Sequence, residues 1–179
     1  MSTDLLAALE RHAARDLDAH ERSSLDRIVE FVRREPACFE RSTVEGHITG
    51  SAWILDHDRT HALLVHHKKL GFWLQPGGHA DGESDVLAVA WREAREESGI
   101  EELEPLDRAV FDVDVHAIPA RKSEPEHFHF DVRYAFIAPP GAQPVVSEES
   151  HDVRWVAKSA IGSYATDTSV MRMAAKWAP

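Results

Sequence analysis

The sequence predicts a mixed α/β domain of layered helices and strands, preceded by a helical extension. Three observations predict this fold class. Apolar residues recur at helical spacing before residue 40, several later segments alternate apolar and polar residues as strands do, and one glycine-rich loop leads into a charged helix. The order of helices, strands, loop and helix, further strands and a closing helix fits a layered domain over residues 44–177.

Length, composition and charge limit the classes of protein to which this sequence can belong. The 179 residues suffice for one domain with an extension, and 43% hydrophobic with 28% charged residues is ordinary for a soluble globular protein. The formal net charge of −11 argues against nucleic-acid and membrane-surface partners, because both favour clustered Lys and Arg. Cys38 is the single cysteine, so no internal disulfide can form, and we expect this residue to be packed. The sequence lacks a run of about 18 apolar residues and a signal-peptide pattern, so a cytoplasmic protein is the default expectation.

Two amphipathic helices are predicted within an N-terminal extension of residues 1–40. Their apolar positions are Leu5, Leu9, Ala13 and Leu17, then Leu25, Ile28, Val29 and Val32. Ser23 and Ser24 are the candidate N-caps of the second helix. We expect these helices to cover the main domain or a partner subunit, which would make a homodimer. A closing helix is predicted to be capped near Asp167 or Thr168.

Several segments predict strands. Residues 46–56 and 61–67 are rich in β-branched and aromatic residues and flank a turn-like stretch, so they predict one hairpin, and residues 152–157 predict another short strand. Two further segments alternate strictly. Their inward positions are Phe111, Val113 and Val115, then Phe128, Phe130, Val132 and Tyr134; their outward positions are Asp112, Asp114 and His116, then His127, His129, Asp131 and Arg133. We expect a solvated outward face; the alternative is a second metal site or a phosphate grip completed by His66 or His67.

Residues 85–98 predict the helix that carries the candidate site. Its apolar stripe consists of Val86, Leu87, Ala90 and Ala94, and Gly99 just beyond it is a natural helix stop. Glu93, Glu96 and Glu97 lie on one side of this helix, where like charges destabilise it by a few tenths of a kcal/mol per pair. A bound cation would remove that cost, so the pattern predicts a metal site.

The stretch from Gly77 to Ile100 resembles the Nudix box. That pattern is Gly, five residues, Glu, seven residues, then Arg-Glu-aliphatic-X-Glu-Glu-X-Gly-aliphatic. The matching residues here are Gly78, Arg92, Glu93, Ala94, Glu96, Glu97, Gly99 and Ile100. Six fixed letters at typical usage coincide by chance roughly once in ten million windows, so the motif is highly specific. The resemblance implies a Nudix-like α/β/α sandwich with a mixed sheet, and hydrolysis of a pyrophosphate linkage in a nucleoside diphosphate joined to another moiety.

One position departs from the pattern. Ser84 stands where the box has its first glutamate, flanked by Glu83 and Asp85. In the family that glutamate is thought to support the helix, often through the box arginine, which is Arg92 here. The departure leaves the metal ligands formally intact, and Glu83 or Asp85 is expected to take over the pairing with Arg92.

The resemblance also implies roles for the box residues. Glu96 and Glu97 would be the principal metal ligands, Glu93 a ligand or the orienting base, and the carbonyl of Gly78 a further ligand. The catalytic set would be Glu93, Glu97 and Arg92. The expected ions are Mg²⁺ or Mn²⁺, because both prefer hard oxygen ligands and Mg²⁺ usually sits between carboxylates, waters and substrate phosphates. The alternative for this helix is a surface helix stabilised by pairs such as Arg92 with Glu96.

Other candidates lie outside the box. Those for binding the substrate are Arg121, Lys122, His79, His127, His129 and Trp73, and those for a general base are Glu126, Asp131, Glu148 and Glu149. For the two basic residues, an ordinary exposed loop is as strong an expectation as contact with phosphates. For Trp73, packing and stacking on a substrate ring both remain open.

Two rival functions share the same fold class. A non-catalytic Nudix domain that senses a nucleotide commonly loses box carboxylates, whereas Glu93, Glu96 and Glu97 are all present. An isomerase of isoprenoid diphosphates needs a catalytic cysteine, and Cys38 lies before the first predicted strand. Hydrolysis of a small nucleotide-type substrate is therefore the favoured prediction.

Overall fold

The computed structural model describes residues 2–120 and 125–177. Four α-helices and one 3-10 helix are α1 (Ser2–Ala13), α2 (Ala19–Arg34), α3 (Val86–Ser98), η1 (Lys158–Ser163) and α4 (Thr168–Lys176). The strands are β1 (Gly46–Leu55), β2 (His61–His67), β3 (Trp73–Leu74), β4 (Gly77–His79), β5 (Glu104–Pro105), β6 (Asp112–Ile118), β7 (His127–Ile137) and β8 (Ser150–Ala157). No helix in these residues is long and apolar enough to cross a membrane.

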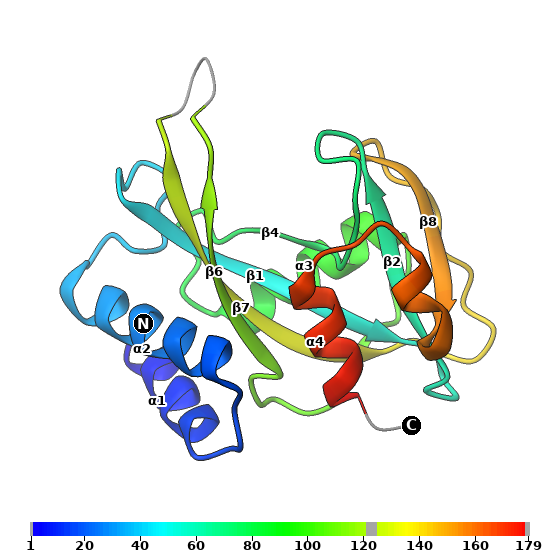
Figure 1. The fold of residues 1–179 in the computed structure, drawn as a ribbon, viewed down its shortest axis with the longest axis horizontal. Helices are drawn as coiled ribbons and strands as arrows, with labels where there is room; N and C mark the ends of the chain where they lie inside the picture. Colours follow the sequence, from blue (N-terminus) through cyan, green and yellow to red (C-terminus); the bar gives the residue numbers. More distant parts are fainter. Residues whose placement is uncertain (1, 121–124, 178–179) are drawn as a thin grey trace. The chain divides into compact units, whose positions relative to one another are not determined.

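The strands form one curled mixed sheet with flanking helices, as the sequence predicts (Figure 1). The hydrogen-bonded order is β3-β2-β1-β7-β5, with β4 paired to β1, β6 to β7 and β8 to β2. β1 and β7 run parallel, because Phe128 N–H donates to Glu45 O near their starts and Ala138 N–H to Leu55 O near their ends. The chain divides into two compact units, and β1, β7 and α3 each contribute residues to both.

The first unit comprises Met1–Gly50, Gly78–Val89 and Arg108–Tyr134. In it, α1 and α2 lie side by side, and α2 packs on β6 (Figure 1). The buried face of α2 includes Phe31, whose ring stacks on that of Phe130 with centroids 4.0 Å apart. The two predicted N-terminal helices are confirmed, but their bounds differ from the expectation.

The carboxylate of Asp18, rather than Ser23 or Ser24, caps α2 by accepting a hydrogen bond from Glu21 N–H. The two serines therefore lie inside the helix, and Leu17 lies outside α1, which ends at Ala13. The serine prediction was wrong because an aspartate five residues earlier offers the same kind of cap and lets α2 run for 16 residues.

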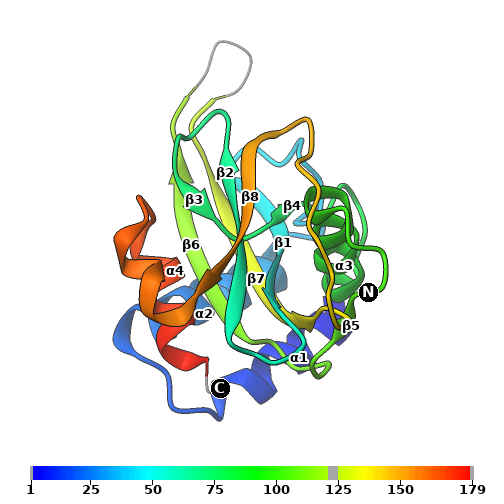
Figure 2. The ribbon, with the colours of Figure 1, turned by 90° about the vertical axis from the view of Figure 1, so that its right-hand side faces the viewer.

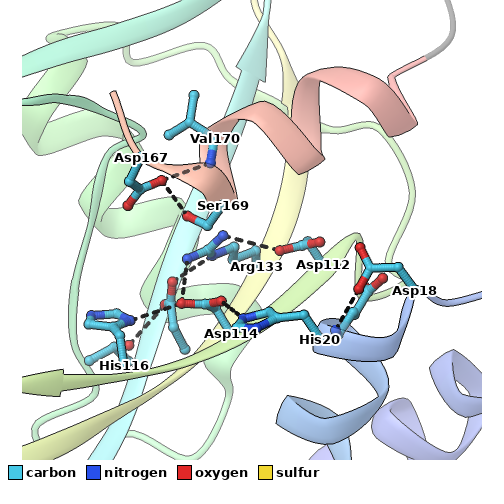
Figure 3. A network of polar contacts seen from close by, with 12 residues as sticks. Asp18, His20, Asp112, Asp114, His116, Arg133, Asp167, Ser169 and Val170 are labelled. Atoms are coloured by element: carbon cyan, nitrogen blue, oxygen red, sulfur yellow. Dashed lines mark hydrogen bonds and ion pairs between the residues drawn. The ribbon is translucent and has the colours of Figure 1, made fainter. Parts of the chain in front are cut away.

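The outward face of β7, which was expected to be solvated, is instead buried at His127 and Asp131 and half-buried at His129, so this prediction is wrong. On β6 beside it, Asp112 and Asp114 are buried and His116 is exposed, and Figure 3 shows the polar contacts among these strands. Arg133 is 1% exposed and donates to Asp131 Oδ2 at 2.7 Å and to Asp112 Oδ2 at 3.1 Å. Its Nη2 lies 3.6 Å from Asp114 Oδ2. Asp114 also hydrogen-bonds with the ring nitrogens of His20, on α2, and His116, on β6. Because each charge has a partner, this face is buried without an isolated ion.

The second unit comprises Ser51–Gly77, Ala90–Asp107 and Ala135–Pro179. Here β2 pairs antiparallel with β8 along its whole length and with β3 on its other edge, so the three strands lie side by side (Figure 2). The predicted hairpin of β1 and β2 is confirmed by the pairing of Leu55 with Ala62. The closing helix α4 is also confirmed, capped by Asp167, whose carboxylate accepts from Val170 N–H.

Candidate active site

The sequence accounts for helix α3 through its buried apolar residues and through the residues that begin and end it. Val86, Val89, Ala90 and Ala94 are at most 2% exposed and fix the helix against the core. At its start the Asp85 carboxylate accepts from Ala88 N–H at 3.2 Å, and Glu83 in turn accepts from Asp85 N–H. At its end Gly99 has a φ of +69°, a left-handed conformation that glycine adopts without strain. The predicted helix and its stop are confirmed.

The three box glutamates project from the last two turns of α3 into different surroundings. Glu96 is exposed, whereas Glu93 has a side chain only 16% exposed and Glu97 is half-buried. Arg92 donates to Glu93 Oε1 at 2.8 Å. Glu97 Oε1 accepts a 2.9 Å hydrogen bond from the backbone N–H of Gly77, at the start of β4. The loop before the helix and the end of the helix are therefore joined directly.

The hydrogen bond between Gly77 and Glu97 requires a glycine, because the backbone at residue 77 runs close to β1. A Cβ at this position would lie 2.2 Å from Ser51 Oγ and 3.0 Å from the backbone Cα of Ser51. These separations are far below van der Waals contact, so a larger residue would push the loop away from β1 and from Glu97.

Burial and mutual repulsion raise the pKa values of the inner glutamates. Burial raises the pKa of Glu97 to about 7; the Gly77 N–H opposes this shift, while the negative charges of Glu93, Glu149 and Glu96 add to it. Burial also raises the pKa of Glu93, against the lowering effect of Arg92, and Glu96 and Glu149 raise it further. Carboxylates that repel one another in partly dry surroundings bind a cation favourably, because the cation removes the repulsion.

One group of side chains has its potential metal-ligating atoms close together. Within residues 2–120 and 125–177, the group of potential ligands whose donor atoms lie within 4.8 Å of one another is formed by His47, His127 and His129. Glu96, the exposed member of the box glutamates, has the freest side chain of the three.

The candidate bases fall into different environments. Glu149 is exposed and acts electrostatically on both Glu93 and Glu97. Its segment is held by Lys68, whose Nζ donates to Glu148 O at 2.6 Å and whose backbone N–H donates to Glu149 O at 3.1 Å. Glu148 and Glu126 are exposed. Asp131 is 2% exposed and is paired with Arg133 and Thr49.

The substrate-binding candidates divide into two groups. His79, His127 and His129 come together in the first unit around His47, with ring centroids 4.9 to 5.4 Å apart. Sequence reasoning missed His47 because it lies alone on β1; its place in a strand beside the glycine-rich loop was the only signal. Arg121 and Lys122 lie outside the described residues, so contact with phosphates and an ordinary exposed loop both stay open for them.

Trp73 is half-buried in the second unit. His66 stacks on it with ring centroids 5.0 Å apart and an interplanar angle of 9°, and Arg154 lies 5.4 Å from its ring centroid. His66, which was considered as an alternative partner of His127 and His129, belongs to the second unit and stacks on Trp73 there. Cys38 is fully buried, as predicted, and burial raises its pKa to about 11. Such a thiol is a poor nucleophile, which argues against an isomerase that uses it.

Comparisons with known proteins agree with the fold and with the family that the sequence resembles. A family model described as the NUDIX domain matches residues 47–177. The structure is similar to a C. elegans Ap4A hydrolase, with a TM-score of 0.58 and 17% identity over 72% of this chain and 93% of that one. It is also similar to the E. coli dihydroneopterin triphosphate pyrophosphohydrolase, with a TM-score of 0.54 and 17% identity over 71% of this chain and 90% of that one.

A third similar structure is a Nudix hydrolase from M. smegmatis, RenU, with a TM-score of 0.53 and 19% identity over 73% of this chain and 81% of that one. A comparison with curated proteins gives no match. At these identities the solved structures establish the fold, whereas the family model spans most of the chain. The chain therefore belongs to the NUDIX domain family, with the fold of its pyrophosphohydrolases.

Proposed function

We propose that the protein is a Mg²⁺- or Mn²⁺-dependent hydrolase of a pyrophosphate linkage in a nucleoside diphosphate joined to another moiety. The observation that carries the proposal is the position of Glu97: half-buried, fixed by Gly77 N–H and surrounded by the negative charges of Glu93, Glu96 and Glu149. A surface helix stabilised only by ion pairs would not place a carboxylate with a raised pKa against a glycine-rich loop.

The donor set fits a hard cation. Glu93, Glu96 and Glu97 would hold it, with the carbonyl of Gly78 as a further ligand, since all four supply oxygen. When bound, the cation neutralises phosphate oxygens and lowers the pKa of a bound water. Arg92 orients Glu93 through their 2.8 Å hydrogen bond and opposes the burial that raises the pKa of Glu93.

In the proposed reaction, water forms a bond to one phosphorus while the anhydride P–O bond breaks, and the leaving phosphate takes the bonding electrons. A base must accept the proton that the water loses. We assign this base to Glu149, because it is exposed, lies within electrostatic range of Glu93 and Glu97, and is held by the contacts of Lys68 with its segment. Asp131 is less suited, because its carboxylate is already paired with Arg133.

The test is a phosphate-release screen with pyrophosphatase and phosphatase coupling. The panel contains nucleoside triphosphates, ADP-ribose, dinucleotide cofactors, dinucleoside polyphosphates such as Ap4A, dihydroneopterin triphosphate and nucleotide sugars, each with Mg²⁺, Mn²⁺ or EDTA. We expect metal-dependent cleavage of at least one class, lost in Glu97→Gln and retained in the exposed control Glu102→Gln. If no compound in the panel is cleaved but a nucleotide binds tightly, the result would instead favour the nucleotide sensor.

A further inference from the structure

Four histidines from three strands meet in the first unit. His47 comes from β1, His79 from β4, and His127 and His129 from β7, where their spacing of two places both side chains on one face. The ring of His47 has its centroid 4.9 Å from that of His79, 5.0 Å from that of His127 and 5.1 Å from that of His129. His47 is thus at the centre of the group.

His47 is the unexplained member. It is 3% exposed, and both of its ring nitrogens are buried without a hydrogen bond to any residue of the described part of the chain. A neutral imidazole carries one donor and one acceptor, and a buried polar group without a hydrogen bond destabilises the folded state. A protein that places such a ring at the centre of other imidazoles needs something that satisfies it.

His127 is oriented as metal-binding histidines are. Its Nδ1 lies 2.9 Å from the carbonyl oxygen of Pro125, so Nδ1 carries the proton and donates to that carbonyl. This bond leaves Nε2 as a lone-pair donor. A backbone carbonyl on the far nitrogen is the usual second partner of a metal-bound imidazole, because it fixes both the tautomer and the ring plane.

We propose that His47, His127 and His129 bind a Zn²⁺ ion through one ring nitrogen each. Those three nitrogens already lie within 4.8 Å of one another. Zn–N bonds of about 2.0–2.1 Å in tetrahedral geometry place ligand atoms roughly 3.4 Å apart, so closure requires small ring rotations. Three imidazoles and no carboxylate select zinc over Mg²⁺ or Mn²⁺. A water or the nearby His79 completes the coordination.

The alternative of a phosphate grip conflicts with the charge of the cluster. An imidazole attracts phosphate when it is protonated. Protonation of the central ring is disfavoured, because His47 is 3% exposed and lies among other imidazoles whose charges would repel it. Neutral imidazole is the form that coordinates a metal.

The site shares no ligand with the glutamates proposed for catalysis, so it does not rest on the proposed hydrolysis. It would join β1 to β7 and, where His79 takes part, to the loop that begins the box. Its expected contribution is to hold these strands together, which makes zinc removal detectable as a lower melting temperature.

The experiment uses the untagged full chain, because a histidine tag binds zinc itself. The protein is stripped with EDTA, dialysed and titrated with Zn²⁺ against a chromophoric chelator, and separately loaded with Co²⁺. We expect one equivalent of tightly bound zinc, a visible Co²⁺ spectrum of the four-coordinate type, and X-ray absorption that reports at least three imidazole nitrogens at about 2.0–2.1 Å. A wild-type protein without stoichiometric binding, or with a spectrum of oxygen ligands, would overturn the proposal.

Zinc binding by single-residue variants tests which residues form the proposed site. His129→Gln should weaken zinc binding by more than the roughly 10- to 100-fold expected for an outer-shell partner, and should abolish the cobalt spectrum. The exposed His57→Gln, in the turn after β1, and Glu97→Gln should both keep zinc and spectrum. Zinc retained in a folded His129→Gln protein would refute the assignment. If that variant does not fold, the measurements on the unmutated protein decide. Loss of catalysis in Glu97→Gln with zinc retained keeps the two proposals distinguishable.

Discussion

The backbone N–H of Gly77 donates a 2.9 Å hydrogen bond to Glu97 Oε1, 20 residues later in the chain. The bond joins the glycine-rich loop to the last turn of α3 and holds a partly buried carboxylate in one orientation. It exists because Gly77 has no side chain to strike Ser51 on β1. The glycine thus acts on the candidate site through a backbone contact rather than through a side chain.

Replacing Gly77 by alanine should therefore damage both stability and metal binding. The new Cβ would lie 2.2 Å from Ser51 Oγ, and relieving this clash should lower the free energy of unfolding by about 1–3 kcal/mol. Displacing the N–H from Glu97 should also weaken Mg²⁺ binding. Urea denaturation and Mg²⁺ titration measure the two effects. Gly162→Ala is the control, because its Cβ would meet Met171 Cε at an ordinary 3.6 Å. Equal behaviour of the two variants would disprove the close-approach argument.

Affinity for Mg²⁺ should rise with pH through neutrality. In the metal-free protein the pKa of Glu97 is raised from 4.5 to about 7, so below pH 7 a proton must leave before the carboxylate can coordinate. Mg²⁺ binding should accordingly be weaker at pH 6 than at pH 8 and should release protons at pH 6. Calorimetry in two buffers of different ionisation enthalpy measures that release. Glu97→Gln should show a smaller pH dependence; an unchanged dependence would assign the titration to another group.

The raised pKa of Glu97 also predicts that, without metal, the stability of the fold falls as the pH rises. Because the folded state holds the Glu97 proton more tightly than the unfolded state, Glu97 adds stability below pH 4.5 that is lost as the pH rises toward about 7. Denaturation in EDTA of the wild type and of Glu97→Gln, at pH 5.5 and 7.5, isolates this contribution. A wild type that gains stability relative to the variant over this range would contradict the assignment.

Removing Glu149 tests the proposed base. Glu149→Gln should lower kcat by about 10²- to 10⁴-fold with a smaller change in KM, because a general base acts in the transition state. Glu102→Gln serves again as the exposed control. If Glu148→Gln shows the loss and Glu149→Gln does not, the base assignment is wrong.

Breaking the Arg133 cluster should be strongly destabilising. Arg133→Met leaves Asp112, Asp114 and Asp131 buried without their common partner, which should cost about 3–5 kcal/mol. The exposed pair of Arg95 with Glu101 offers the control, since Arg95→Met should cost less than about 1 kcal/mol. Denaturant unfolding compares them. Similar small losses in both variants would show that the buried cluster contributes little.

Acid should weaken the same cluster. The hydrogen bond from His116, the charge of Arg133 and the hydrogen bond from His20 hold the pKa of Asp114 well below 3.8, against the effect of burial. This lowered pKa contributes stability that is present above the unfolded value and lost as the pH falls through the folded one. Acid unfolding of Asp114→Asn should therefore depend less on pH in the strongly acidic range than that of the wild type.

Ser84 provides a direct comparison with the family pattern. If a glutamate at this position supports the helix, Ser84→Glu should raise turnover, and kcat in the coupled phosphate assay measures this. An unchanged or lower rate would count against the idea that Ser84 weakens the site, whose helix is already capped by Asp85 at Ala88 N–H.

What the sequence predicted correctly depends on local pattern. The helix with Glu93, Glu96 and Glu97, its stop at Gly99 and the hairpin of β1 with β2 are set by neighbours within a few residues. The burial of Asp112 and Arg133 could not be predicted, because alternation shows which residues share a face and not what covers it. His47 was missed for a similar reason: 80 residues separate it from His127, and only the pairing of distant strands joins them.

Lys68 affects the proposed chemistry from a position outside the site. Its ammonium holds the carbonyl of Glu148 and its backbone N–H holds that of Glu149, so a turn after β2 determines where a carboxylate 81 positions later is presented. Acetylation of this lysine, or its exchange for methionine, would release one of the two tethers without altering any acidic side chain. Turnover could then be tuned from the protein surface, by a residue that an inhibitor or an engineer can reach without entering the site.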